Sequence, residues 1–271
     1  MKALILNSGR GMRMGGLSLE HPKCMTKLSP GETILSRQLK QLVNIGISDV
    51  IITTGYLKEL LVDYCIELNL PLNIMFTDNP RYEETNYIYS IYCARKLLDD
   101  DILLMHGDLV FEDAVLDKIF NCNASCTPVS SALSLPDKDF KAVVDNGIIK
   151  RVGVEFFENA VAAQPLYKLL YADLTQWLDR IIIYCENGNV NVYAENALNE
   201  LDGACNIKAL DIQDKVCHEI DTAEDLQMVS EMINNGLNYV KYKHNSCHRL
   251  RKVYNNLQEV QNGKYYCKSD I

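Results

Sequence analysis

The feature that most constrains the fold is a short apolar segment, residues 2–7, that leads directly into a glycine-rich loop. The loop has a Gly-x-Gly-x-Arg motif at 9–13 and a Pro-Lys pair at 22–23. Because glycine lacks a Cβ, backbone N–H groups in such a loop can approach a polyphosphate, and Arg13 and Lys23 would add positive charge at its two ends. The loop lacks the Gly-Lys-Ser/Thr ending of a P-loop. The pattern predicts a nucleoside-triphosphate site after the first strand.

Strand-like and helix-like segments alternate through the first half of the chain. We expect strands at 2–7, 49–54, 72–76 and 102–105, and helices at 33–45, 57–68 and 88–98. This alternation predicts an α/β fold with a doubly wound, mixed but mostly parallel sheet of the Rossmann-like type. Ligands are then expected at the carboxyl ends of the strands, which share one edge.

The pattern changes at about residue 125, where short β-like runs and helical stretches replace the regular alternation. We expect strands at 129–135, 141–144 and 148–154, helices at 173–185 and 190–201, a late strand at 207–212 and a helix after Thr222. This predicts one domain over 1–235 with a small insertion at about 125–205. Residues 236–271 lack strong apolar periodicity, so we expect a tail or linker, compatible with a connection to a further C-terminal domain.

Composition excludes several classes of protein. A net charge of −9 argues against a general nucleic-acid surface, which needs clustered Lys and Arg. No segment approaches the roughly 20 apolar residues of a membrane span and no signal pattern opens the chain, so we expect a cytoplasmic protein without a membrane span. The ten cysteines are scattered and are expected to be reduced thiols, with Cys24, beside Lys23, more reactive than the others. A homodimer is compatible with the sequence.

Two aspartates are candidates for holding a metal ion. Asp108 follows the strand expected at 102–105, and Asp221 closes a Glu-Ile-Asp segment before a helix. Mg²⁺ prefers oxygen ligands and is commonly held by one or two carboxylates together with phosphate oxygens. Taken singly, each aspartate could be a turn or helix-cap residue, but together with the glycine loop they favour a Mg²⁺ site. The five histidines have no partner by spacing and are expected to be structural or at the surface.

These motifs resemble those of the sugar-nucleotidyltransferase superfamily, over about residues 1–230. Gly9, Gly11, Arg13, Pro22 and Lys23 match its strand, Gly-x-Gly-x-Arg and Pro-Lys signature, and Asp108 and Asp221 match its two metal aspartates. The resemblance implies that Lys23 and Arg13 are catalytic, Lys23 between the α-phosphate and the acceptor and Arg13 on the departing phosphates. It also implies nucleotide contacts from Leu6, Asn7, Ser8, Gly9 and Gly11.

Within this superfamily, the chain is most similar to small bacterial cytidylyltransferases of the phosphocholine and 2-aminoethylphosphonate type. The similarity lies in the segment 55–59, in an Asn…Tyr-Ser-x-Tyr arrangement at 86–92 and in the segment 193–196. It implies CTP contacts from Gly55, Tyr56, Asn86 and Ser90, and acceptor contacts from Phe140, Tyr193, Glu195 and Asn196. Core packing is an equally good interpretation of Tyr89 and Tyr92.

The resemblance implies a reaction in which CTP and a small zwitterionic phosphonate or phosphate give a CDP-linked product and pyrophosphate. A thin aromatic cage with a retained carboxylate favours a primary amine, because NH₃⁺ needs hydrogen-bond acceptors, and this favours 2-aminoethylphosphonate over phosphocholine. The alternatives are a CTP:phosphocholine cytidylyltransferase, an enzyme acting on phosphoethanolamine, and a sugar-1-phosphate nucleotidyltransferase. Outside enzymes, the alternative is a nucleotide-sensing regulatory module.

Overall fold

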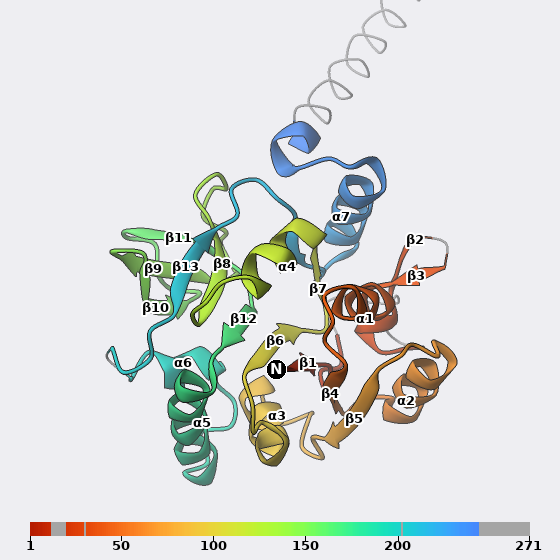
Figure 1. Ribbon diagram of the computed structural model, residues 1–271, viewed down its shortest axis with the longest axis horizontal. Coiled ribbons are helices and arrows are strands. Elements are labelled where there is room, and N and C mark those ends of the chain that lie inside the picture. Colours follow the sequence, from red (N-terminus) through yellow and green to blue (C-terminus); the bar gives the residue numbers. More distant parts are fainter. Residues whose placement is uncertain (12–19, 30, 202, 244–271) are drawn as a thin grey trace, which may run out of the picture.

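A ten-stranded mixed sheet runs through the centre of the protein, which the computed structural model describes over residues 1–11, 20–29, 31–201 and 203–243 (Figure 1). In spatial order, the strands are β11 (Ala160–Ala163), β9 (Lys141–Asp145), β10 (Ile148–Gly153), β13 (Lys208–Asp211), β8 (Cys126–Ser130), β12 (Leu166–Leu169), β6 (Ile102–His106), β1 (Lys2–Leu6), β4 (Asp49–Thr54) and β5 (Asn73–Asp78). Strands β6, β1, β4 and β5 pair in parallel, as do β8 and β13, whereas the other pairs are antiparallel. The predicted α/β fold with a mixed sheet is confirmed, although parallel pairing is less general than expected.

Helices cover both faces of the sheet. They are α1 (Ile34–Asn44), α2 (Lys58–Glu67), α3 (Tyr87–Ala94), α4 (Asp113–Phe120), α5 (Tyr171–Glu186), α6 (Ala194–Leu198) and α7 (Ala223–Asn235). Alternate residues of β1 point to opposite layers, as the period of a strand requires. Ala3 and Ile5 pack with α1, α2 and α4, whereas Leu4 and Leu6 pack with α3 and α5, which lie below the sheet in Figure 1. Burial on both faces explains why residues 3–6 of the strand are all apolar.

The second half contains more short strands than the sequence predicted. Strand β8 begins earlier than the expected 129–135 and ends at Ser130, because the Ser130 hydroxyl accepts the backbone N–H groups of Ala132 and Leu133 and turns the chain. The second inserted helix, α6, is shorter than the expected 190–201. Strands β11 and β12 were not predicted, because runs of four residues carry little periodicity.

A separate two-stranded ribbon joins distant parts of the chain. Strand β14 (Cys217–Glu219) pairs antiparallel with β7 (Leu109–Phe111), and Glu219 lies opposite Leu109. Just beyond the ribbon, the backbone N–H of Ile220 donates to the carbonyl oxygen of Asp108 at 2.9 Å. Asp108 and Asp221 are therefore brought to the same place, although they are far apart in the sequence.

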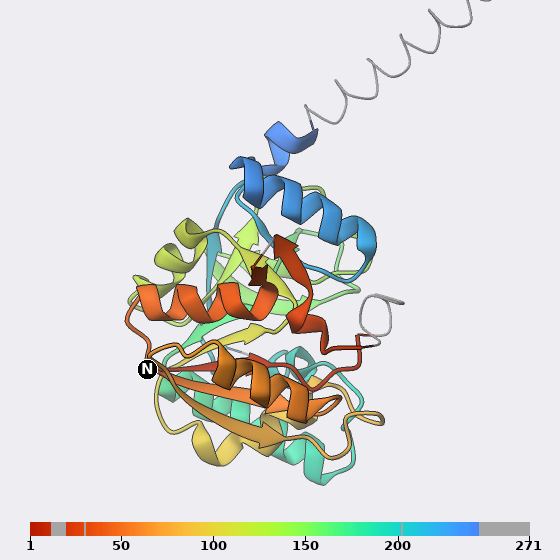
Figure 2. The same cartoon turned by 90° about the vertical axis from the view of Figure 1, so that its right-hand side faces the viewer.

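Helix α7 covers this ribbon and packs against β2 (Lys27–Ser29), as Figure 2 shows. It ends at Gly236, which adopts a left-handed conformation with φ of 59°. Tyr239, beyond this cap, is buried against Val216 and Met232. Packing thus continues a few residues past the predicted boundary at 235, and the rest of the predicted tail, 244–271, lies outside the described residues. Within the part of the chain that is described, no helix is both long and apolar enough to cross a membrane.

A buried lysine closes the loop that precedes β9. The side chain of Lys141 is 0% exposed, and its ammonium donates to the carbonyl oxygens of Pro136 at 2.7 Å and Asp139 at 3.1 Å. The same ammonium lies 4.1 Å from the ring centre of Phe157. Burying an ammonium is costly unless such contacts replace water. The lysine therefore holds the loop that carries Phe140 against the sheet.

The capping box of α7 gives a pH-dependent prediction. Asp225 accepts from the backbone N–H of Thr222 at 2.8 Å, and burial, which raises its pKa, is outweighed by bonds from His218 and Thr222 that lower the pKa to about 2. We expect Asp225→Asn to lower the free energy of unfolding by about 1 kcal/mol at neutral pH. A lowered pKa stabilises the folded state above the ordinary pKa of about 4, and this contribution is lost as the pH falls towards about 2. Urea unfolding of both proteins across this range measures the difference, and a pH-independent difference would contradict the assignment to charge.

Candidate active site

The carboxyl end of β1 opens into a pocket that contains most of the predicted phosphate loop. Its lining residues are Leu6, Asn7, Gly9, Gly11, Lys23, Cys24, Gly107, Asp108 and Asp221. Gly11 has φ of 64°, and a Cβ at this position would lie 3.0 Å from the Cβ of Lys23, so glycine is needed for both conformation and space. Lys23 begins a short 3-10 turn, Lys23–Met25. Arg13, the other predicted catalytic cation, lies outside the described residues.

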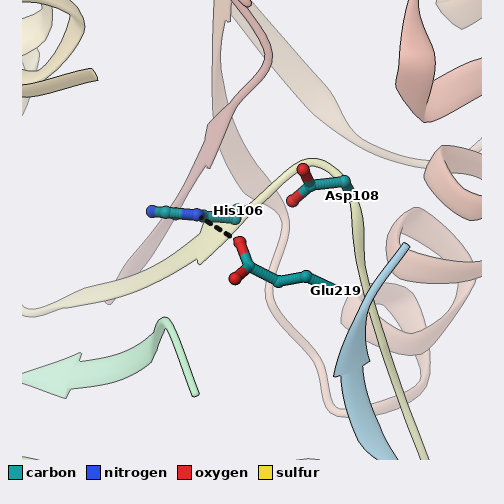
Figure 3. A group of neighbouring side chains, drawn as sticks. All are labelled: His106, Asp108 and Glu219. Carbon is teal, nitrogen blue, oxygen red and sulfur yellow. Dashed lines mark hydrogen bonds and ion pairs between the residues drawn. The ribbon is translucent and has the colours of Figure 1, made fainter. Parts of the chain in front are cut away.

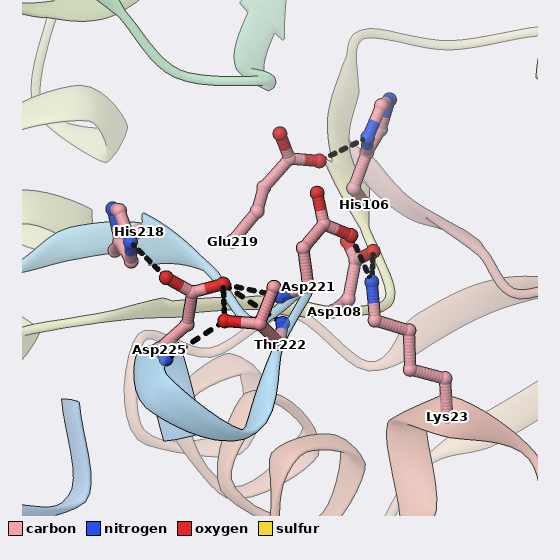
Figure 4. Close-up of polar contacts among 8 residues, drawn as sticks. All are labelled: Lys23, His106, Asp108, His218, Glu219, Asp221, Thr222 and Asp225. Carbon is pink, nitrogen blue, oxygen red and sulfur yellow. Dashed lines mark hydrogen bonds and ion pairs between the residues drawn. The ribbon is translucent and has the colours of Figure 1, made fainter. Parts of the chain in front are cut away.

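The Lys23 ammonium lies between two carboxylates (Figure 4). Its nitrogen is 2.6 Å from Asp108 Oδ2 and 2.5 Å from Asp221 Oδ1. Burial alone would lower the pKa of Lys23, but the charges of Asp108 and Asp221 outweigh it and raise the pKa. Burial likewise works to raise the pKa of Asp108, and the charges of Lys23 and His106 outweigh it and lower the pKa. The structure therefore brings together three of the predicted site residues as a charged cluster.

The donor set around Asp108 fits a hard divalent cation. Within the described residues, Asp108 Oδ1 is buried and has no hydrogen-bond partner. Asp221 adds a second carboxylate close to it, and Mg²⁺ is commonly held by one or two carboxylates together with phosphate oxygens. An unpaired carboxylate oxygen that cannot reach water is costly, and a metal ion would compensate for it. The geometry thus suits the predicted Mg²⁺ site.

His106 and Glu219 extend this cluster and were not predicted as site residues. Ligand atoms of His106, Asp108 and Glu219 all lie within 4.8 Å of one another (Figure 3). His106 Nδ1 is 2.8 Å from Glu219 Oε1. Burial would lower the pKa of His106, but the hydrogen bond to Glu219 and the negative charge of Glu219 outweigh burial and raise the pKa. Burial and the nearby Asp108 raise the pKa of Glu219. Local spacing indicated no partner for His106, and the structure pairs it with Glu219, which is distant in the sequence.

Sequence signals for these two residues exist in hindsight. His106 is the last residue of β6, at the ligand-binding edge of the sheet. Glu219 lies two residues before Asp221 in an extended segment, so both side chains can point to the same side. The partner of His106 is 113 residues away along the chain, which no local spacing reveals.

A second pocket adjoins the first and holds most of the predicted nucleotide contacts. Its lining residues are Leu6, Ser8, Gly9, Asn79, Tyr82, Thr85, Asn86, Tyr87, Ser90, His106, Asp108 and Asn191. Asn79 is buried and organises one wall, because its amide donates to the hydroxyls of Ser90 and Thr85, each at 3.0 Å. The structure thus brings Ser8, Asn86 and Ser90 into one pocket beside the carboxylates.

Gly55 and Tyr56 lie behind the loop and are not among the described lining residues of either pocket. A Cβ at Gly55 would lie 2.5 Å from the carbonyl oxygen of Ser8, so this glycine lets the loop after β4 approach the loop after β1. The ring of Tyr56 lies 6.5 Å from that of Tyr82, and the Arg10 guanidinium lies 5.5 Å from the Tyr56 ring centre. Their place in the fold is that of supports for the phosphate loop.

The four predicted acceptor residues separate into three locations. Phe140 and Tyr193 contact each other with ring centres 5.2 Å apart, and Tyr193, 38% exposed, lies 6.0 Å from Tyr87 of the second pocket. Glu195 is buried behind Tyr87. Asn196 lines a different cavity between α5 and α6. The aromatic pair adjoins the site, Glu195 supports it from behind, and Asn196 is not brought to it.

The expected reactivity of Cys24 is not supported. Its side chain is 2% exposed, and burial, followed by the nearby Cys65 and Asp108, raises the pKa of the thiol. A protonated, enclosed thiol is a poor nucleophile. The described cysteines are all free, in agreement with the expectation of reduced thiols.

Comparison with known proteins agrees with this geometry. Residues 3–133 match the model of the MobA-like NTP transferase domain. This match covers just under half of the chain, the part that carries the glycine-rich loop and Asp108. The chain is 26% identical over 257 residues to the CTP:phosphoglutamine cytidylyltransferase of Campylobacter jejuni, covering 85% of this chain and 100% of the relative. It is 23% identical to the choline-phosphate cytidylyltransferase of Streptococcus pneumoniae, covering 87% and 99%.

Two further similarities have a narrower meaning. A 134-residue stretch is 32% identical to the CMP-5'-(3-aminopropyl)phosphonate synthase of Streptomyces rubellomurinus, covering 49% of this chain and 20% of the relative. The solved structure of the CTP:phosphocholine cytidylyltransferase from Streptococcus pneumoniae superposes with a TM-score of 0.68 at 19% identity, covering 86% of this chain and 98% of that one. At this identity, the superposition establishes the nucleotidyltransferase fold.

Two glycines of the site give a matched pair of variants. A Cβ at Gly107 would lie 1.6 Å from Asn7 Oδ1 and 2.9 Å from the carbonyl oxygen of Leu6, whereas a Cβ at Gly9 would have nothing within 4 Å. We expect Gly107→Ala to lower the melting temperature by several degrees, as overpacking of about 1–3 kcal/mol does. Gly9→Ala should leave the melting temperature unchanged, because the added Cβ would contact no other residue. It should weaken nucleotide binding, because Gly9 lines both pockets and the Cβ would contact a bound nucleotide.

Adding Asn7→Ala to Gly107→Ala removes the nearest clashing atoms and should restore part of the lost stability. Differential scanning calorimetry and nucleotide titration measure both effects. Equal melting temperatures for Gly107→Ala and the wild type would contradict this prediction, because they would show that the loop after β1 shifts to remove the clash at little cost in stability.

Proposed function

We propose that this chain is a cytoplasmic, CTP-dependent cytidylyltransferase that joins CMP to a small zwitterionic phosphonate or phosphate, with 2-aminoethylphosphonate favoured, and releases pyrophosphate. The observation that carries the proposal is the Lys23 ammonium held between Asp108 and Asp221 at the mouth of the glycine loop. Three relatives support the choice of cytidine, since their names specify CTP, CMP or cytidylyl transfer.

The cluster has the charges that this reaction needs. An oxygen of the acceptor phosphonate or phosphate attacks the α-phosphorus of CTP, a P–O bond forms, and the bond to the β-phosphate breaks as pyrophosphate leaves. Lys23 would neutralise charge on the α-phosphate and the attacking oxygen, and Arg13 would bind the departing phosphates. Mg²⁺, held by Asp108 and Asp221, would supply further neutralisation of phosphate charge when bound. No general base is needed, because the acceptor oxygen is already ionised.

The surroundings of Tyr193 support an acceptor with a cationic nitrogen. Phe140, Tyr193 and Tyr87 form a row of aromatic rings, and Tyr87 lines the same pocket as Asp108. Aromatic faces attract ammonium groups by about 0.5–2 kcal/mol. The relatives are named for phosphoglutamine, aminopropylphosphonate and choline phosphate, which all combine a phosphorus acid with nitrogen. The exposed ring of Tyr193 makes phosphocholine the second candidate.

Pyrophosphate release with a matrix of substrates tests the proposal. CTP, UTP, ATP and GTP are each combined with 2-aminoethylphosphonate, phosphocholine, phosphoethanolamine and glucose 1-phosphate, and products are identified by mass spectrometry. We expect turnover with CTP and one or more of the nitrogen-containing acceptors. Turnover confined to UTP or to the sugar phosphate would overturn the assignment. Nucleotide binding without turnover of any pair would favour a regulatory module.

Variants of the charged cluster separate its members. Asp108→Ala and Asp221→Ala should each lower turnover by at least about a hundredfold, because loss of a metal carboxylate removes charge stabilisation in the transition state. Chelation of Mg²⁺ with EDTA should abolish turnover, and added Mg²⁺ should restore it. Near-normal activity of either variant would remove that aspartate from the metal site.

Lys23→Ala should lower kcat far more than it raises the KM for CTP. The reason is that the proposed contacts of Lys23, with the α-phosphate and the attacking oxygen, are strongest in the transition state. Steady-state kinetics with circular dichroism as a folding control provide the comparison. A change confined to the KM for CTP would instead make Lys23 a residue of ground-state binding.

A further inference from the structure

Glu195 is a buried carboxylate whose two oxygens are both engaged by tyrosines. The side chain is 1% exposed; the Tyr87 hydroxyl donates to Oε2 and the Tyr167 hydroxyl donates to Oε1 at 2.9 Å. Burial and the charge of Glu195 raise the pKa of both tyrosines, so both hydroxyls keep their protons and remain donors. A buried carboxylate needs such donors, and here each oxygen of Glu195 is held by one of them.

The backbone around Glu195 is fixed in place. The indole N–H of Trp177 donates to the carbonyl oxygen of Ala194 at 2.9 Å, and the rings of Trp177 and Tyr167 contact each other edge to face at 5.3 Å. These contacts anchor α6 to α5 and leave little freedom for Glu195 to swing towards the pocket. The carboxylate therefore acts from the interior.

Tyr87 is the residue that connects Glu195 to the site. It is the first residue of α3, and its ring lines the nucleotide pocket next to Asn86. The ring lies 4.5 Å from that of His106 and 6.0 Å from that of Tyr193. Tyr87 thus stands where the nucleotide pocket, the His106–Glu219 pair and the exposed aromatic pair meet.

We infer that Glu195 is a positioning residue that selects the acceptor through Tyr87, which it holds at the boundary between the nucleotide and acceptor sites. This rests on the proposed function, because the group selected is the cationic nitrogen of the acceptor. A phenol that donates to a carboxylate keeps its ring electron-rich, and the ring attracts a cation without offering it a hydrogen-bond acceptor. Substitution of Glu195 should then weaken the binding of a primary-amine acceptor and of a trimethylammonium acceptor to the same extent. A carboxylate that touched the acceptor directly would favour the primary amine, because only that group donates hydrogen bonds.

A double-mutant cycle of Tyr87→Phe and Glu195→Gln tests the inference, with acceptor KM measured at saturating CTP and CTP KM at saturating acceptor. Each single variant should raise the acceptor KM by about 5- to 20-fold, and the double variant should lose no more than the larger single, because the two residues act as one unit. The KM for CTP should rise less than the acceptor KM, although Tyr87 also lines the nucleotide pocket. Tyr167→Phe, the matched control, removes the other hydrogen bond of Glu195 away from the pocket and should change the acceptor KM by less than about twofold.

Comparison of 2-aminoethylphosphonate with propylphosphonate, which keeps the phosphonate but lacks the ammonium, keeps the test decisive if Glu195→Gln fails to fold. Tyr87→Phe alone should then lower the ratio of kcat/KM for 2-aminoethylphosphonate to that for propylphosphonate by about 5-fold or more. Additive losses in the cycle, an unchanged acceptor preference, or a rise confined to the KM for CTP would each overturn the inference on an active wild type. A wild type that is inactive with every CTP–acceptor pair would overturn the proposed function, and this inference with it.

Discussion

The pairing of β7 with β14 is the constraint on which the active site depends. The N–H of Ile220 donating to the carbonyl of Asp108 fixes two aspartates side by side that lie far apart in the sequence. In that arrangement one ammonium, that of Lys23, forms an ion pair with both carboxylates. If the ribbon opened, two buried carboxylates would lose their shared partner, and uncompensated buried charge is among the most costly changes a fold can suffer. The apolar cluster under α7 keeps the ribbon closed.

The site lies at the junction of two differently built halves. The parallel strands β6, β1, β4 and β5 end at one edge and supply the glycine loop and the proposed nucleotide pocket, whereas the mainly antiparallel insertion supplies the aromatic pair. The halves are tied together at the start of α3, where the backbone N–H of Asn86 donates to the carbonyl of Val190 at 2.9 Å. The proposed nucleotide pocket and the proposed acceptor surface, joined at one helix terminus, could then adapt to new acceptors without disturbing the glycine loop.

Much of this arrangement could be predicted from sequence, and the exceptions have physical causes. Gly9, Gly11 and Lys23 belong to one local motif, and the strand-end rule places Asp108 at the same edge. The role of Glu195 could not be predicted, because a helix of five residues, α6, shows no periodicity that tells a buried face from an open one. For the same reason, the sequence could not reveal that its neighbour Asn196 lines another cavity. The ribbon strands β7 and β14 have three residues each, too few to be recognised.

The enclosure of Lys141 has a consequence for chemical labelling. Surface lysines react with amine-directed reagents at rates set by their exposure, but an ammonium at 0% exposure, bonded to backbone carbonyls and covered by Phe157, reacts only when its loop lifts. That loop carries Phe140, whose ring contacts Tyr193 on the proposed acceptor side of the site. The rate at which this single amine is labelled, measured by mass spectrometry, therefore reports how often the proposed acceptor side opens while the rest of the protein stays folded.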